Sequence, residues 1–194
     1  MAIPRLVRSR LKTPKPRIAA EAAPAPPTSA QVRTPVDRQL GKLWCWAAVG
    51  AGIHNVVKKP AVISQCEVAK KHLGHTDCCK NPPPAEPPPG CNVEAALNEV
   101  LDKLLVTQTN GSGTLPLPTI RSEILRGRPV ACAIRFPPPR PFHFVVIDGY
   151  IRTPSETILI VRDPEQLELR MSYASLISNY RNEGAAWQWW YEIA

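Results

Sequence analysis

The sequence predicts an α+β domain of two lobes, with helices first along the chain and an antiparallel sheet second. Up to about residue 127, apolar residues recur at three- and four-residue spacing, as on one face of a helix. From residue 128 onward they gather in short β-branched runs bounded by proline or turn residues, as in buried strands. With 194 residues, 44% of them hydrophobic, the chain can bury a core in one domain. We therefore expect a helical lobe over residues 35–127 and a sheet lobe over residues 128–194.

Residues 1–34 are expected to form a disordered tail ahead of the domain 35–194. They are rich in Pro, Ala and Arg and show neither helical nor strand periodicity. Seven of them are basic and one is acidic, so they carry +6 of the net charge of +8 and leave the domain only +2. A domain with so little charge is not expected to bind nucleic acid. The tail lacks the apolar segment of a signal peptide, so it can be a signal for another export route, a removable pro-segment or a linker.

Four helices are expected in the first lobe and one in the second: residues 45–57, 65–73, 93–104 and 119–126, and a last helix from its cap Ser172 to Tyr180. The first is rich in small residues, and Pro60 prevents it from continuing. The second begins with the capping box Ser64-Gln-Cys-Glu67 and ends at Gly74. Asn92 is the expected N-cap of the third, whose apolar residues recur at helical spacing.

Three short apolar runs and one aromatic run predict the strands of the second lobe: residues 129–136, 142–150, 157–161 and 185–193. We expect the first three to be antiparallel, with the second and third joined as a hairpin. Residues 109–118 are broken by glycine and proline and are expected to be a loop.

Four cysteines lie close together around a proline-rich segment: Cys66, Cys78, Cys79 and Cys91. Such a segment needs an anchor, and three kinds are compatible with the residues. The cysteines can form disulfides, bind zinc together with a nearby histidine, or remain reduced thiols. Paired C-x2-C spacing, which is typical of structural zinc sites, is missing.

One stretch carries the chemistry of the first lobe, running from Gln39 to Cys45 and into the helix that Cys45 opens. A helix beginning there aims unpaired backbone N–H groups and the positive end of its dipole at the sulfur, which favours thiolate over thiol. Gln39, six residues earlier, can place its side-chain amide beside the backbone N–H of Cys45. Both donors would then face the oxygen of an acyl group under attack.

His143 is the candidate base, because it opens a strand at the end of the sheet, where a cleft between lobes is expected. Cysteine catalysis needs a group that takes up the thiol proton and delivers it to the leaving amine. The imidazole in turn needs a carboxylate or amide to orient it. Asp163 can be its neighbour across the hairpin, at roughly 5 Å between Cβ atoms. Asp148, five residues along the same strand, is expected on the opposite face and about 17 Å away.

These features resemble the papain-like cysteine proteases, above all their small bacterial branch of effector proteases and bacteriocin-processing peptidases. The resemblance rests on Gln-x5-Cys-Trp running into a helix, on a histidine that opens a strand, and on Asp-Pro after a strand, and it covers about residues 36–194. It implies a papain-like fold with Cys45 as nucleophile, His143 as base and acid, and Asp163 orienting the ring. Gln39 would be the oxyanion donor. The family often has asparagine at the position of Asp163, whereas the bacterial branch commonly has aspartate.

The expected function is hydrolysis of peptide bonds through an acyl-enzyme on Cys45, with a peptide or protein as substrate and with no cofactor or metal. Acyl transfer or deamidation on the same residues is the alternative among enzymes. A non-catalytic module that binds protein partners through its proline-rich loops is the alternative outside enzymes. No run is apolar and long enough to span a membrane, and we expect a monomer.

Overall fold

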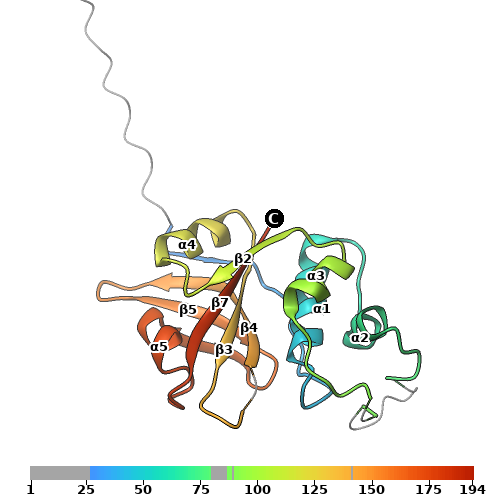
Figure 1. The fold of residues 1–194 in the computed structure, drawn as a ribbon. Coiled ribbons are helices and arrows are strands. Elements are labelled where there is room, and N and C mark those ends of the chain that lie inside the picture. Colours follow the sequence, from blue (N-terminus) through green and yellow to red (C-terminus); the bar gives the residue numbers. More distant parts are fainter. Residues whose placement is uncertain (1–26, 80–86, 89, 141) are drawn as a thin grey trace, which may run out of the picture.

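The computed structural model describes residues 27–79, 87–88, 90–140 and 142–194 of the chain. Figure 1 shows α1, α2 and α3 gathered in one lobe, beside a sheet that α4 and α5 cover. The elements are β1 Ser29–Gln31, α1 Cys45–Val57, α2 Gln65–Leu73, α3 Leu97–Lys103, β2 Gln108–Ser112, α4 Leu117–Leu125, β3 Val130–Arg135, β4 Phe142–Arg152, β5 Thr157–Asp163, β6 Leu167–Ser172, α5 Tyr173–Ser178 and β7 Ala186–Ile193. The predicted α+β class is confirmed. Among the described helices, none has the length and apolar character that a bilayer crossing requires.

The sheet is antiparallel throughout, with the strand order β2-β7-β3-β4-β5-β6, and β1 pairs with β4 beside this path. Alternation along the strands gives each face its own core. Ala131 and Ala133 of β3 face α1 and the helical lobe. Val130 and Cys132 face the other way, toward α4 and α5. The sheet is therefore buried on both sides, and its end beside α1 is where the two lobes meet.

The helical lobe follows the prediction for α1 and α2 and departs from it at α3. Ser64 and Glu67 form the predicted capping box of α2, and Gly74 ends it with a left-handed conformation. The third helix begins at Leu97, not at residue 93, and Asn92 does not cap it. The side-chain oxygen of Asn92 instead accepts a hydrogen bond from the backbone N–H of Leu43 at 3.0 Å. Residues 93–96, between Asn92 and α3, are in neither a helix nor a strand, and the carbonyl oxygen of Val93 accepts a hydrogen bond from Trp46 at the start of α1.

Three of the described strands were not expected. β2 begins one residue before the predicted loop 109–118 and takes up its first residues, and β6 follows β5 where no strand was predicted. β1 lies within residues 1–34, which were expected to be a tail, and pairs with residues 149–151 of β4. Beyond it, the backbone N–H of Thr34 donates to the Asp148 carboxylate at 2.9 Å. The predicted boundary at residue 34 is therefore wrong, because Ser29 to Thr34 belong to the folded domain; residues 1–26 lie outside the described part.

The two disulfides of the structure are Cys66–Cys79 and Cys78–Cys91. They decide between the three alternatives for the cysteine cluster. Sulfur atoms that are bonded to each other are neither zinc ligands nor free thiols. Cys45 and Cys132 remain as free cysteines, and both are buried.

Removing residues 1–34 is expected to lower the melting temperature by about 5–10 °C relative to a chain that lacks only residues 1–26. The longer deletion removes β1 and leaves the buried Asp148 carboxylate without the Thr34 N–H, a loss of roughly 2–3 kcal/mol. Thermal unfolding followed by circular dichroism measures the difference. Equal melting temperatures for the two chains would show that the β1 segment contributes nothing to stability.

Candidate active site

Cys45 is the first residue of α1, at the junction of the two lobes, and 7% of its surface is exposed. The residues on either side of it are anchored by their indole rings. Trp44 Nε1 donates to the carbonyl oxygen of Cys91 at 2.6 Å, and Trp46 Nε1 donates to that of Val93 at 2.8 Å. Trp44 is the N-cap residue and makes no side-chain cap. The N–H groups of Ala47 and Ala48 donate to the carbonyl oxygen of Trp44, so among the described residues those of Cys45 and Trp46 are the ones available to an anion at this helix end.

The residues just before Cys45 also contact the turn after β5. The backbone N–H of Gln39 donates to the carbonyl oxygen of Pro164 at 2.9 Å, and the Arg38 guanidinium donates to that of Glu165 at 2.6 Å. The segment that leads to Cys45 is thereby fixed to the turn that follows Asp163. This contact brings two distant parts of the sequence to one site.

His143 and Asp163 form a buried hydrogen-bonded pair, with 2.8 Å between Nε2 and Oδ1. The register of β4 and β5 pairs Val146 with Arg162, so Asp163 lies diagonally across from His143 on the same face. The hairpin thus brings His143 and Asp163 together, as predicted. His143 is 6% exposed, and bulk water has little access to the pair.

His143 from β4 and Cys45 from α1 line the same cavity. Because Nε2 is engaged by Asp163, Nδ1 is the ring nitrogen left for Cys45. Burial opposes the charged imidazolium, but the hydrogen bond to Asp163 and the interaction with the Cys45 side chain outweigh it and raise the pKa of His143 to about 10. A protonated His143 at neutral pH is the state that pairs with a thiolate and holds a proton ready for a leaving group.

The Asp163 carboxylate is held by more groups than the sequence indicated. Its Oδ2 accepts from the Tyr180 hydroxyl at 2.6 Å, and its Oδ1 accepts from the backbone N–H of Glu165 at 2.7 Å. The Arg181 guanidinium lies 3.6 Å from Oδ2. Burial alone would raise the pKa of Asp163, but the hydrogen bonds from His143, Tyr180 and Glu165 lower it to about 2. Asp163 is thus ionised at neutral pH and fixed in position.

Tyr180 and Arg181 could not be found from the sequence, because they follow α5, and nothing in the sequence places the end of that helix beside β5. Glu165 lies two residues from Asp163, but no motif marks it.

Gln39 is not oriented as predicted. Its Nε2 donates to the carbonyl oxygens of Gly41 at 3.0 Å and Lys42 at 2.8 Å, and its Oε1 is buried without a hydrogen-bond partner. Both amide hydrogens are therefore engaged by the turn that leads to Cys45. To reach an oxyanion, Nε2 would have to release one of these carbonyl groups.

Gln39→Ala is expected to lower kcat on the order of a hundredfold if the amide joins the oxyanion site during the reaction. It also removes two hydrogen bonds within the turn, so a loss of stability of roughly 1–2 kcal/mol is expected at the same time. Kinetics of the peptide hydrolysis and a thermal melt separate the two effects. A lowered melting temperature with unchanged kcat would restrict Gln39 to the turn.

Asp148 lies elsewhere, as its strand position predicted. It sits at an irregularity of the β4–β5 register, between Ile147 and Gly149, and is fully buried. Its carboxylate accepts from Arg162 Nε at 2.9 Å and from the Thr34 backbone. Asp148 therefore joins β4 to β5 and to the N-terminal segment, and not to the site. Cys132 is buried on the far face of the sheet, and burial raises the pKa of its thiol.

Two groups of described residues have ligand atoms close enough for a metal ion. His143, Asp163 and Glu165 form one, but the first two bond each other and Glu165 pairs with Arg181 at 2.5 Å. Asp77, Cys78 and Cys91 form the other, but its two cysteines are bonded as a disulfide. Both groups are accounted for by contacts within the chain.

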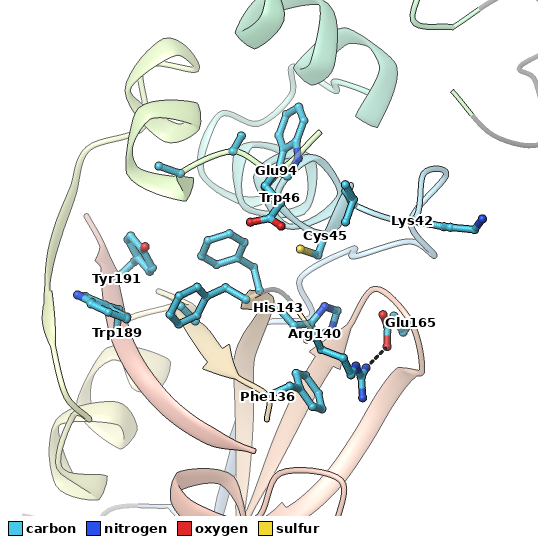
Figure 2. Close-up of a pocket in the computed structure, with 16 residues that line it drawn as sticks. Lys42, Cys45, Trp46, Glu94, Phe136, Arg140, His143, Glu165, Trp189 and Tyr191 are labelled. Carbon is cyan, nitrogen blue, oxygen red and sulfur yellow. Dashed lines mark ion pairs between the residues drawn. The ribbon is translucent and has the colours of Figure 1, made fainter. Parts of the chain in front are cut away.

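A cavity of about 440 Å³ opens beside Cys45 and His143. Figure 2 shows Trp189 and Tyr191 on one side of this pair and Arg140 and Glu165 on the other, with Glu94 reaching in from the helical lobe. The lining residues come from both lobes and are Lys42, Leu43, Cys45, Trp46, Glu94, Ala95, Ala96, Ala133, Phe136, Arg140, Phe142, His143, Phe144, Glu165, Trp189 and Tyr191. The volume is that of a small-ligand site, and a thiol and an imidazole lie at its wall.

Comparison with solved structures identifies the fold. A protein described as a C39-like peptidase from Bacillus anthracis superposes with a TM-score of 0.51 at 13% identity, over 86% of this chain and 98% of that one. Digestive procathepsin L 3 of Tenebrio molitor superposes with a TM-score of 0.51 at 11% identity, over 89% of this chain and 72% of that one. A chain from a study of the mite allergens Blo t 1 and Der p 1 superposes with a TM-score of 0.50 at 12% identity, over 90% of this chain and 73% of that one. No family model matches the sequence, and no curated protein matches it.

Proposed function

We propose that the protein, whose fold is that of papain-like peptidases, is a cysteine peptidase acting through Cys45, His143 and Asp163. The observation that carries the proposal is that a single buried imidazole bonds an ionised carboxylate and lies beside a thiol at a helix start, at the wall of a cavity between two lobes. A structural histidine would not need both partners. The proposal also assigns the chain to the small bacterial branch of the family. This is supported by the Bacillus anthracis protein, 98% of whose chain superposes on this one.

The reaction proceeds in two halves. The Cys45 thiolate attacks the carbonyl carbon of the scissile bond, and the backbone N–H groups at the start of α1 stabilise the oxyanion. His143 gives its proton to the nitrogen of the leaving amine as the C–N bond breaks, which leaves a thioester on Cys45. His143, now neutral, takes a proton from water, whose oxygen attacks the thioester and releases the acid with return of the thiolate.

Incubation with a peptide library followed by mass spectrometry tests this function. Hydrolysis shortens peptides, deamidation adds about one mass unit to a glutamine or asparagine, and transglutamination joins two peptides, so the three chemistries give different products. Loss of every product in Cys45→Ala assigns the chemistry to this thiol. No product at all, together with failure of iodoacetamide near pH 6 to label Cys45 ahead of Cys132, would favour the non-catalytic binding module.

A further inference from the structure

The cavity has an aromatic trough on the sheet side, which we define as Ala133 with the side chains of Phe142, Phe144, Trp189 and Tyr191. β3 lies between β4 and β7, and its Ala133 pairs with Phe144 on one side and with Trp189 on the other. A methyl group therefore forms the floor between two strands that carry large rings. The result is a groove shaped for a long side chain.

The rings of the trough are arranged as two edge-to-face pairs. Phe142 and Trp189 have centroids 5.3 Å apart at 76°, and Phe144 and Tyr191 have centroids 6.1 Å apart at 70°. Edge-to-face contacts of this kind are a favourable arrangement of aromatic rings and hold the rings in fixed relative orientations. Trp189 is 39% exposed, which is high for a side chain of this size and shows that the trough is accessible.

The helical lobe places one carboxylate, that of Glu94, across the cavity from the trough. Glu94 lines the cavity from the helical lobe, and Figure 2 shows its carboxylate directed into the cavity. Its backbone neighbour Val93 is fixed by the hydrogen bond from Trp46. Within the described ranges no ion pair involves Glu94, whereas Arg140 on the other side of Cys45 is paired with Glu165 and Glu183. The trough thus combines aromatic faces with one carboxylate that has no cationic partner there.

One ring of the trough already makes a cation–π contact within the chain. The guanidinium of Arg135, which does not line the cavity, lies 4.7 Å from the centroid of Phe142. An apolar guest in the trough would strip water from Glu94 without replacing it, and this carries a cost. A guest with an apolar stem and a cationic head would instead pack its stem on the rings and pair its head with the carboxylate.

We propose that the aromatic trough selects a substrate with an arginine or lysine side chain close to the bond that is cut, with Glu94 receiving the charged head. The proposal rests on the peptidase function proposed above. It names the substrate class for that site, a peptide with a basic residue near the scissile bond.

Peptides that differ at one position test the selection. A fluorogenic series carries arginine, lysine, norleucine, phenylalanine or glutamate at each of the three positions before the scissile bond, and kcat/KM is measured with the full chain. At one position arginine is expected to exceed norleucine by about tenfold. Glu94→Gln is expected to remove most of that ratio, and Glu94→Lys to favour glutamate. Glu99→Gln, an exposed acid on α3 that does not line the cavity, is the matched control and should keep the ratio.

Binding without turnover separates this proposal from the peptidase function. The Cys45→Ala chain is titrated with the arginine and norleucine peptides, and the affinities are compared with those of Cys45→Ala/Glu94→Gln. Tighter binding of the arginine peptide, lost with Glu94, supports the trough even if no peptide is ever cleaved. Equal binding of the two peptides, or tighter binding of norleucine or phenylalanine that Glu94→Gln leaves unchanged, would overturn it, whatever the hydrolysis assay shows.

Discussion

Cys45→Ala is expected to reduce peptide hydrolysis to the uncatalysed level, a loss on the order of 10⁵-fold or more. No other described thiol can replace it, because Cys132 lies on the far face of the sheet and the remaining cysteines form disulfides. The fold should be retained, since a small buried side chain is replaced by a slightly smaller one. Kinetics with the best library peptide and a thermal melt on the same preparation measure both.

Adding a second substitution in the proposed triad to Cys45→Ala should not lower the rate of hydrolysis any further. Residues that act as one catalytic unit are not additive, so Cys45→Ala and Cys45→Ala/Asp163→Asn are expected to be equally inactive. Residual hydrolysis by Cys45→Ala that falls further when Asp163 is also changed would mean that another nucleophile acts beside His143. The proposed thioester would then be wrong.

Asp163→Asn is expected to lower kcat/KM by at least about tenfold, because an amide cannot balance the charge of the imidazolium. Asparagine is the better probe than alanine, since Asp163→Ala would leave the buried Tyr180 hydroxyl without its acceptor and cost stability as well. The pH profile separates orientation from folding. In the wild type the alkaline limb should lie near pH 10, where His143 loses its proton. In Asp163→Asn this limb should move to lower pH.

The raised pKa of His143 also determines how the stability of the protein depends on pH. The pKa of His143 is raised from 6.5 to about 10 on folding, so its contribution is complete below pH 6.5 and is lost as the pH rises toward 10. Asp163→Asn should flatten this part of the stability curve.

Asp148→Asn is the matched control, because Asp148 is the other buried aspartate of the β4–β5 pair. It should lower stability by roughly 2–3 kcal/mol through its contacts with Arg162 and Thr34, and leave kcat/KM of the folded protein within about twofold. If Asp148→Asn silences a well-folded protein while Asp163→Asn does not, the orienting residue has been assigned wrongly.

The three residues of the candidate site could be predicted because each lies in a strong local pattern. Cys45 starts a helix of small residues, His143 opens a strand, and Asp163 ends the next strand of the same hairpin. The orientation of Gln39 could not be predicted, since it depends on where the carbonyl groups of Gly41 and Lys42 point. Those directions follow from the turn conformation and not from the residue types.

Two of the unexpected strands share a physical cause. β1 lies on a short free stretch of β4 and β2 at a sheet margin, and their residues do not alternate between apolar and polar. Their pairing is decided by the strand beside them, which the sequence does not place. β6 is different, because its residues Leu-Glu-Leu-Arg-Met-Ser alternate and the strand could have been predicted from them. The late start of α3 has a similar origin, because Asn92, a good N-cap, is bound to Leu43 in another part of the chain. The aromatic trough could not be predicted from the sequence either, since it depends on the cross-strand register at Ala133.

The disulfide Cys78–Cys91 gives the site two opposing redox requirements. The proposed reaction requires the free thiol of Cys45 to stay reduced, whereas Cys91 and the two residues after it hold Leu43, Trp44 and Trp46 through three hydrogen bonds. Cys66 and Cys79 are partly exposed and Cys78 and Cys91 are buried, so rising reductant should open the outer bond first and spare turnover. Activity is then expected to fall only when the inner bond opens, which thiol counting by mass spectrometry can follow. The protein would then be active only over an intermediate range of reductant concentration. Below this range the Cys45 thiol is oxidised, and above it the segment that holds Cys45 in place loosens.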